Sequence, residues 1–203
     1  MPRAMPSTEP ARAWQRMLSG RRLDLLDPSP LDIEIEDIAH GLARVARWNG
    51  QTAGENAFSV AQHCLTVEQL ALQLKPGLPA RWRLAALLHD APEYVVGDLI
   101  SPFKAALGLD YKAFELRLLS AIHLRFGLPP ALPENIRTLI KKADVQSAYW
   151  EAVMLAGFSK SEAARYFGPV PRGPAPDLAP LPPTRAAERF HARFQLLFPA
   201  EPA

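Results

Sequence analysis

The feature that most constrains this chain is an apolar run that ends in two polar residues able to bind a metal. Residues 84–88 are Leu-Ala-Ala-Leu-Leu, and His89 and Asp90 follow directly. In such a buried stretch an isolated charge is costly unless it is neutralised, paired or bound to a cation. The pair His89-Asp90 is therefore poorly suited to a core and well suited to a metal site.

Two further residues can complete the same site. The Ser-x-x-Gln pattern at Ser59 predicts a capping box that opens a helix running to about Leu74, with His63 on its apolar side. A second helix is predicted over residues 133–156 and places Asp144 among apolar neighbours. Two imidazoles and two carboxylates suit one divalent ion, which can be Mn²⁺, Co²⁺, Fe²⁺, Zn²⁺ or, less well, Mg²⁺.

In chain order these residues give H…HD…D, and with this pattern the sequence resembles the HD superfamily of metal-dependent phosphohydrolases. Residues 89–104 are similar to the stretch HD-x-x-E-x(4)-D-x-x-x-P-x-K of the bacterial 5′-deoxynucleotidases, and Arg47-Trp48-Asn49 resembles the same branch. Phage dATP triphosphohydrolases share a similar opening, here Asp24-Leu25-Leu26 and Glu36-Asp37-Ile38-Ala39. The resemblance extends over roughly residues 20 to 155.

This resemblance implies an all-α fold, an HD-domain helical bundle with a divalent metal site between helices. It also implies roles for individual residues, by their positions in the matching motifs. The expected metal ligands are His63, His89, Asp90 and Asp144; the expected catalytic residues are Glu93 and Asp98; the expected substrate-binding residues are Arg47, Trp48 and Lys104.

Each of these residues also has a plainer interpretation when it is taken alone. His63 could be an ordinary core histidine, and Asp144 could be a salt-bridge partner of Lys141. Glu93 and Asp98 could be solvated carboxylates. The substrate-binding candidates also have plainer interpretations. Arg47 could be a surface arginine, Trp48 a packed aromatic ring and Lys104 a solvated lysine. Only the order and spacing of the whole set favour a metal site.

Two versions of one activity follow from the resemblance. The enzyme would remove phosphate from deoxynucleoside 5′-monophosphates, or it would release triphosphate from a dNTP, dATP in particular. Two alternatives stay open, a catalytically silent metal- or nucleotide-binding regulatory module and a signalling-nucleotide phosphodiesterase. His40, His123 and His191 have no motif support and are expected to be structural.

The domain organisation follows from the distribution of proline and of apolar stripes. We expect a loosely ordered segment over residues 1–20, one HD domain over 21–168 and a Pro-rich loop over 169–183. A C-terminal helix over 184–203 would pack on the same domain through the stripe Phe190, Phe194 and Leu197. Strand signals are scarce, and residues 33–35 are the best candidate.

Composition limits the class of partner. The net charge of +2 gives no reason to expect a nucleic acid polymer. No stretch approaches the ~20 apolar residues of a membrane span, and the N-terminus lacks the apolar core of a signal peptide. One cysteine, Cys64, fits a reducing compartment. We therefore expect a cytoplasmic protein that acts on a small nucleotide, away from membranes, as a homo-oligomer, most simply a dimer.

Overall fold

The expected all-α class is confirmed by the structure, a computed structural model that describes residues 13–98 and 109–198, without the side chains of 109–111. A two-stranded antiparallel hairpin precedes the helices, with β1 at Trp14–Arg16 and β2 at Arg22–Asp24. Two short 3-10 helices are η1, Pro30–Asp32, and η2, Arg47–Gly50. The α-helices are α1 Ile35–Leu42, α2 Val60–Leu74, α3 Ala80–Leu87, α4 Glu93–Val96, α6 Leu109–Arg125, α7 Glu134–Met154, α8 Lys160–Phe167 and α9 Pro183–Leu197.

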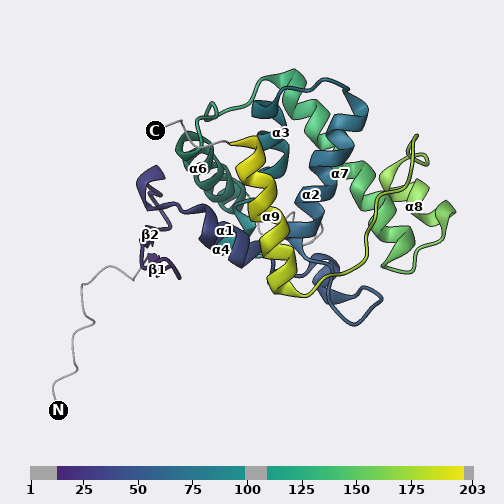
Figure 1. Ribbon diagram of the computed structural model, residues 1–203, viewed down its shortest axis with the longest axis horizontal. Coiled ribbons are helices and arrows are strands. Elements are labelled where there is room, and N and C mark those ends of the chain that lie inside the picture. The colour runs from purple at the N-terminus through teal and green to yellow at the C-terminus, as the bar shows by residue number, and fades with distance from the viewer. Residues whose placement is uncertain (1–12, 99–108, 199–203) are drawn as a thin grey trace, which may run out of the picture.

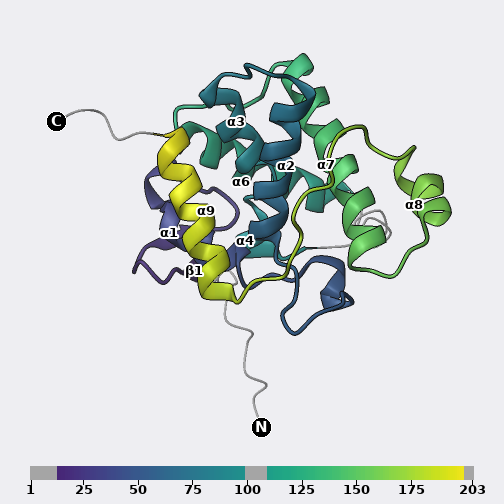
Figure 2. The same ribbon diagram turned by 45° about the vertical axis from the view of Figure 1, so that its right-hand side comes forward.

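Helix α2 is the central element of the bundle. It packs against α7, α3 and α9, while α1 packs against α9 and α4. Figures 1 and 2 show α9 lying across α1 and α2, and α8 standing on the far side of α7. One continuous apolar core joins these helices, and α8 adds a smaller aromatic cluster around the fully buried Tyr149. No helix in the described part of the chain combines the length and apolar character needed to cross a membrane.

The start of α2 matches the predicted cap only in part. The hydroxyl of Ser59 accepts a hydrogen bond from the backbone N–H of Gln62 at 3.3 Å, as a capping residue should. The Gln62 side chain does not return to the cap. It instead donates to the carbonyl of Ala179 at 2.9 Å and accepts from the N–H of Leu181 at 3.0 Å. The Pro-rich segment is thereby fixed to the outside of α2.

The C-terminal helix packs as its apolar stripe predicts. Phe190, Phe194 and Leu197 are buried in the main core. A buried carboxylate supports the same contact, because Glu68 of α2 accepts hydrogen bonds from Arg193 of α9 and from Arg83 of α3. Helix α9 therefore closes over the α2–α3 pair, although the domain boundaries themselves remain a prediction.

Residues 33–35, the best strand candidate in the sequence, do not form a strand. Ile33 and Glu34 do have extended backbones, but Ile35 already begins α1. The carbonyl of Ile33 accepts a hydrogen bond from the Arg125 side chain at 2.9 Å, so a side chain rather than a neighbouring strand satisfies it. The hairpin β1–β2 was not predicted, and it places residues 14–16 of the expected loose segment in a paired strand.

The chain changes direction where the apolar run meets His89-Asp90. The sequence predicts a helix over about residues 80–90, which Pro92 would kink or end because it cannot donate to the carbonyl of Leu88. The helix observed here, α3, already ends at Leu87, and a turn leads to Pro92, which caps the N-terminus of α4. Proline fits there because the first helical N–H groups have no partner within the helix. Glu93, the first residue of α4, is thus held directly beyond the turn.

Gly41 in α1 allows α4 to come close. A Cβ added at Gly41 would lie 2.8 Å from Cβ of Tyr94 and 3.1 Å from its carbonyl oxygen. In an open helix, glycine to alanine stabilises by ~1 kcal/mol. Here overpacking costs ~1–3 kcal/mol, so Gly41→Ala should lower the free energy of unfolding in a urea titration. A variant more stable than the wild type would show that α1 and α4 have room to spare.

Candidate metal centre

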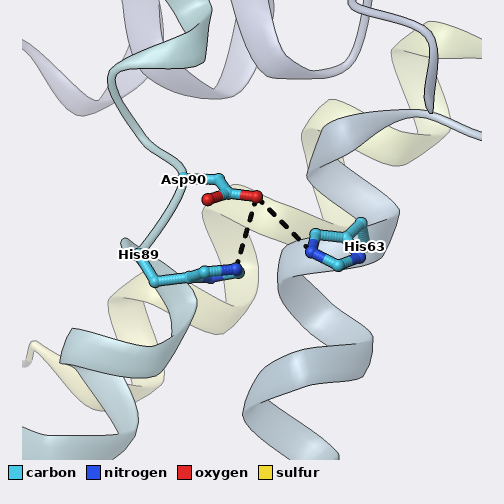
Figure 3. Close-up of side chains that lie close together, drawn as sticks. All are labelled: His63, His89 and Asp90. Carbon is cyan, nitrogen blue, oxygen red and sulfur yellow. Dashed lines mark ion pairs between the residues drawn. The ribbon is translucent and has the colours of Figure 1, made fainter. Parts of the chain in front are cut away.

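Three side chains able to bind a metal meet at one point (Figure 3). His63 comes from α2, whereas His89 and Asp90 come from the turn between α3 and α4. One ligand atom from each lies within 4.8 Å of the others. Nε2 of His63 is 3.4 Å from Oδ2 of Asp90, and Nε2 of His89 is 3.3 Å from the same oxygen. The structure thus brings together three of the four predicted ligands.

The hydrogen bonding of the two imidazoles fits a cation. Nδ1 of His89 is 2.9 Å from the carbonyl of Ala86, and Nδ1 of His63 is 2.6 Å from Oε1 of Glu151. With the hydrogen on Nδ1, each ring keeps a lone pair on Nε2. Both Nε2 atoms are buried and have no hydrogen-bond partner among the described residues. Two such nitrogens beside a carboxylate form a donor set that suits a divalent ion.

Asp144, the fourth predicted ligand, lies at the edge of this cluster. Its Oδ1 is 3.4 Å from Nε2 of His63, and its Oδ2 accepts a hydrogen bond from Lys141 at 2.8 Å. The salt bridge that was the plainer interpretation of Asp144 is therefore present, and it uses only one oxygen. The other oxygen faces the imidazole nitrogen that a metal would use.

The acidic members of the cluster are kept ionised by their surroundings. Burial alone raises the pKa of Asp90, but the neighbouring His89 and His63 hold it well below its usual range. Burial also raises the pKa of Asp144, but the close approach and the charge of His63 bring it below the usual value. Both carboxylates are thus ionised. Burial lowers the pKa of His63 and of His89, but the neighbouring carboxylates raise it well above its usual value, so binding of a cation requires each ring to lose its Nε2 hydrogen.

The two predicted catalytic carboxylates lie around Arg47. Glu93 is only 2% exposed, and Oδ2 of Asp98 is 3.0 Å from Nη1 of Arg47. Burial lowers the pKa of Arg47, but the surrounding carboxylates outweigh this effect and raise the pKa above its usual value, so the guanidinium stays charged. These carboxylates are Glu151, Asp98, Asp90 and Glu93. The arginine therefore borders both the metal cluster and the predicted catalytic pair.

Trp48 occupies an unusual backbone conformation beside Arg47. Its φ is 57° and that of Asn49 is 51°, in the left-handed region that costs roughly 1–2 kcal/mol for a residue with a Cβ. The indole ring packs against Phe158 and Phe167, with ring centroids 5.8 and 5.9 Å away. Its Nε1 donates to Oε2 of Glu151 at 2.9 Å. Such local strain is typical of segments shaped for a functional role.

Glu151 of α7 was missed by the sequence analysis. It is fully buried and lies between the metal cluster and the Arg47–Trp48 pair. Burial raises the pKa of Glu151, but the charges of His63 and Arg47 bring it below its usual range. The available signal was its position: it follows the predicted ligand Asp144 by seven residues, which places both on one face of a helix.

The other residues considered in the sequence do not belong to the metal-binding group or lie outside the description, although Cys64 is in contact with His89. Lys104 falls outside the described residues. Cys64 is buried, and burial raises the pKa of its thiol. His123 is buried in α6, with a pKa lowered by burial, while Nε2 of His191 lies 3.4 Å from the Glu36 carboxylate. Neither these side chains nor His40 belongs to the metal-binding group found among the described residues.

Comparison with known proteins agrees with this geometry. Residues 60–144, which run from the start of α2 to Asp144, match the family model described as HD domain. An uncharacterized protein of Rhodobacter capsulatus is 63% identical over 190 residues, which cover 92% of this chain and 96% of that protein. The uncharacterized protein YfdR of Escherichia coli K12 is 33% identical over 169 residues, 80% of this chain and 83% of its own length.

Proposed function

We propose, from the premise that the chain belongs to the HD-domain superfamily of metal-dependent phosphohydrolases, that it hydrolyses the phosphate ester of deoxynucleoside 5′-monophosphates. One observation carries the proposal. Two buried imidazole nitrogens without hydrogen-bond partners among the described residues converge with Asp90, and Arg47 lies beside them. This arrangement combines a candidate cation site with a guanidinium suited to phosphate oxygens.

The ligands of the ion in this proposal are His63, His89, Asp90 and Asp144. When bound, a divalent ion polarises a phosphoryl group and makes water a stronger nucleophile. The imidazoles are pre-oriented for this task by hydrogen bonds from Nδ1, to Ala86 in one case and to Glu151 in the other. Such fixed outer contacts keep both Nε2 atoms directed at one point.

Glu93 and Asp98 have different roles in this proposal, one towards the attacking water and the other towards Arg47. In this proposal the buried carboxylate of Glu93, at the start of α4, accepts a proton from the attacking water, which requires hydrogen-bond reach in the substrate complex. Asp98 holds Arg47 by an ion pair and is the second carboxylate of the reaction. Because Arg47 is charged and bordered by carboxylates, an incoming phosphate competes with Asp98 for its Nη1.

The charge of the site favours the monophosphate over the triphosphate version. Carboxylates dominate the described surroundings of Arg47 and of the cluster, and both Arg47 and Lys141 already contact carboxylates. Each additional phosphate adds negative charge that needs a further cation. A dATP triphosphohydrolase remains the second version, and the assay below separates the two.

The test is a phosphate-release screen on the purified protein. Deoxynucleoside monophosphates, ribonucleoside monophosphates and dNTPs are each incubated with Mn²⁺, Co²⁺ or Mg²⁺, and orthophosphate is measured with malachite green. Chromatography, with and without inorganic pyrophosphatase, detects released triphosphate and pyrophosphate. We expect orthophosphate from dNMPs. A folded, metal-binding protein that releases nothing from any of these substrates would contradict the proposal and favour the silent regulatory module.

Sugar preference gives a sharper expectation. If Trp48 packs against C2′, a ribose hydroxyl would be buried without a partner, at a cost of about 1–3 kcal/mol. This corresponds to a deoxy-over-ribo preference of roughly tenfold to a hundredfold in kcat/KM. Trp48→Ala should erode the preference more than it slows dAMP hydrolysis, whereas Arg47→Ala should raise KM for dAMP and AMP alike. Equal kcat/KM for dAMP and AMP in the wild type would rule out this role of Trp48.

A further inference from the structure

Glu151 links two parts of the site that come from different segments of the chain. Its Oε1 is 2.6 Å from Nδ1 of His63 and accepts a hydrogen bond from the hydroxyl of Ser147 at 2.7 Å. Its Oε2 accepts from Nε of Arg47 at 3.2 Å and from Nε1 of Trp48 at 2.9 Å. A fully buried carboxylate is thus saturated, with one oxygen directed to each side.

The Oε1 side fixes the state of a candidate ligand. A carboxylate can only accept, so the hydrogen of the neutral His63 ring must lie on Nδ1 and the lone pair on Nε2. That Nε2 is the atom that faces Asp90 and Asp144. Carboxylates in this position typically orient the ring and raise its basicity as a ligand.

The Oε2 side fixes the two residues assigned to phosphate and sugar. Arg47 and Trp48 both lie in η2, where Trp48 and Asn49 have left-handed backbones. Since the guanidinium and the indole share one acceptor, they are held side by side in a segment that is locally strained. The backbone of this segment is also held in place, because the backbone N–H of Arg47 donates to the carbonyl of Phe58 at 2.8 Å.

We propose that Glu151 is a positioning residue that couples the metal ligand His63 to the substrate-recognition pair Arg47–Trp48. The coupling rests on the proposed function, because the roles of Arg47 and Trp48 depend on it. Glu151 itself touches neither substrate nor reacting atoms. Its effect is that the orientation of the metal ligand and the orientation of the substrate contacts are set by one side chain.

In Glu151→Gln the side chain can keep its contact with His63 or its contacts with Arg47 and Trp48, but not both, because an amide has an acceptor oxygen at only one end. If its oxygen faces Arg47 and Trp48, the NH₂ group donates to Nδ1 of His63. The ring hydrogen then moves to Nε2 and blocks the ligand lone pair. If its oxygen faces His63 instead, the NH₂ group opposes the donors of Arg47 and Trp48. Neither orientation preserves both sets of hydrogen bonds.

The experiment measures both sides of the site in the same variants of the full chain. Binding of Mn²⁺ alone is measured by titration calorimetry, and the visible absorption of the Co²⁺-loaded protein reports on ligand geometry. KM and kcat are measured with dAMP. For Glu151→Gln we expect metal affinity about 10- to 100-fold weaker, an altered Co²⁺ spectrum and a raised KM. Trp48→Phe, which removes the Nε1 donor and makes the ring smaller but leaves Glu151 and His63 in place, should raise KM and leave Mn²⁺ affinity unchanged.

A matched control is Glu68→Gln. Glu68 is also a buried glutamate held by two basic side chains, Arg83 and Arg193, but it lies at the α2–α3–α9 contact. It should lose stability without a change in the Co²⁺ spectrum. If Glu151→Gln fails to fold, Glu151→Asp keeps the buried charge but is one carbon shorter, and it should show the same two effects in smaller measure.

The outcomes separate this inference from the proposed function. Folded Glu151 variants that bind Mn²⁺ within twofold of the wild type, or that change only one of the two readouts, overturn the coupling while hydrolysis by the wild type still stands. A wild type that binds Mn²⁺ but hydrolyses no nucleotide overturns the proposed function and, with it, the substrate side of the coupling. Joint weakening of metal binding and of dAMP recognition supports both.

Discussion

His89→Ala and Asp90→Ala should each abolish binding of the divalent ion and lower phosphate release by more than ~10³-fold. A metal at a phosphoryl group contributes several kcal/mol of transition-state stabilisation, and each decade in rate corresponds to ~1.4 kcal/mol. Both residues lie in the turn between α3 and α4, and both contribute an atom to the group within 4.8 Å. Metal content after dialysis, measured by mass spectrometry, and orthophosphate release check the expectation.

His191→Ala is the control for these variants. His191 is a histidine of α9 whose ring lies 3.4 Å from the Glu36 carboxylate, outside the metal cluster. It should keep the metal and the activity of the wild type. Unchanged metal content in both His89→Ala and Asp90→Ala would show that the ion, if one is bound, lies elsewhere.

Glu93→Gln should leave metal binding nearly intact and reduce kcat by ~10²–10⁴-fold, the usual loss when a positioned acid or base is removed. Glutamine keeps the size of the buried side chain but does not accept a proton at neutral pH. Single-turnover measurements with dAMP, together with Mn²⁺ titration, distinguish loss of chemistry from loss of metal.

Asp98→Asn should have a similar effect on kcat and, because Asp98 pairs with Arg47, a separate effect on KM. Removal of this charge leaves Glu151, whose Oε2 is 3.2 Å from Nε of Arg47, as the other ion-pair partner of Arg47 among the described residues, so phosphate no longer competes with Asp98. KM for dAMP should therefore fall in Asp98→Asn and stay unchanged in Glu93→Gln. Near wild-type turnover in both variants would remove the catalytic assignment even if the metal site is correct.

The long helices were predictable because their apolar stripes are long enough to define a period. The Ser59 cap and the apolar face of α2 predicted its bounds, and Phe190, Phe194 and Leu197 predicted the buried face of α9. The end of α3 was placed three residues too late. Pro92 was expected to break the helix, but the chain leaves the helix at Leu87 and uses Pro92 to begin α4.

Short elements were missed for a different reason. Strands of three residues such as β1 and β2 are too short for alternation to be recognised. Helix α8 is short as well, although Ser159 and Glu162 form a complete capping box that marks its start in the sequence. A search for caps, in addition to periodicity, would have found it.

Within the site, the sequence pattern identified residues by motif and could not identify those that act through contacts. His63, His89 and Asp90 were predicted and lie together, and Asp144 lies next to them. Glu151 belongs to no motif, since its importance depends on η2 folding against α7. That contact joins residues more than a hundred positions apart, which local patterns do not reveal.

Gln62, which fixes the Pro-rich segment to α2, has a consequence for where this chain tolerates insertions and deletions. Surface loops usually accept changes in length at little cost. Here Ala179 and Leu181 are held in register by the residue immediately before His63. Length changes well before residue 179 can be absorbed by the loop, whereas a change between 179 and α9 would pull on the helical turn that orients His63. Fusion points and linkers are therefore best placed away from that short stretch.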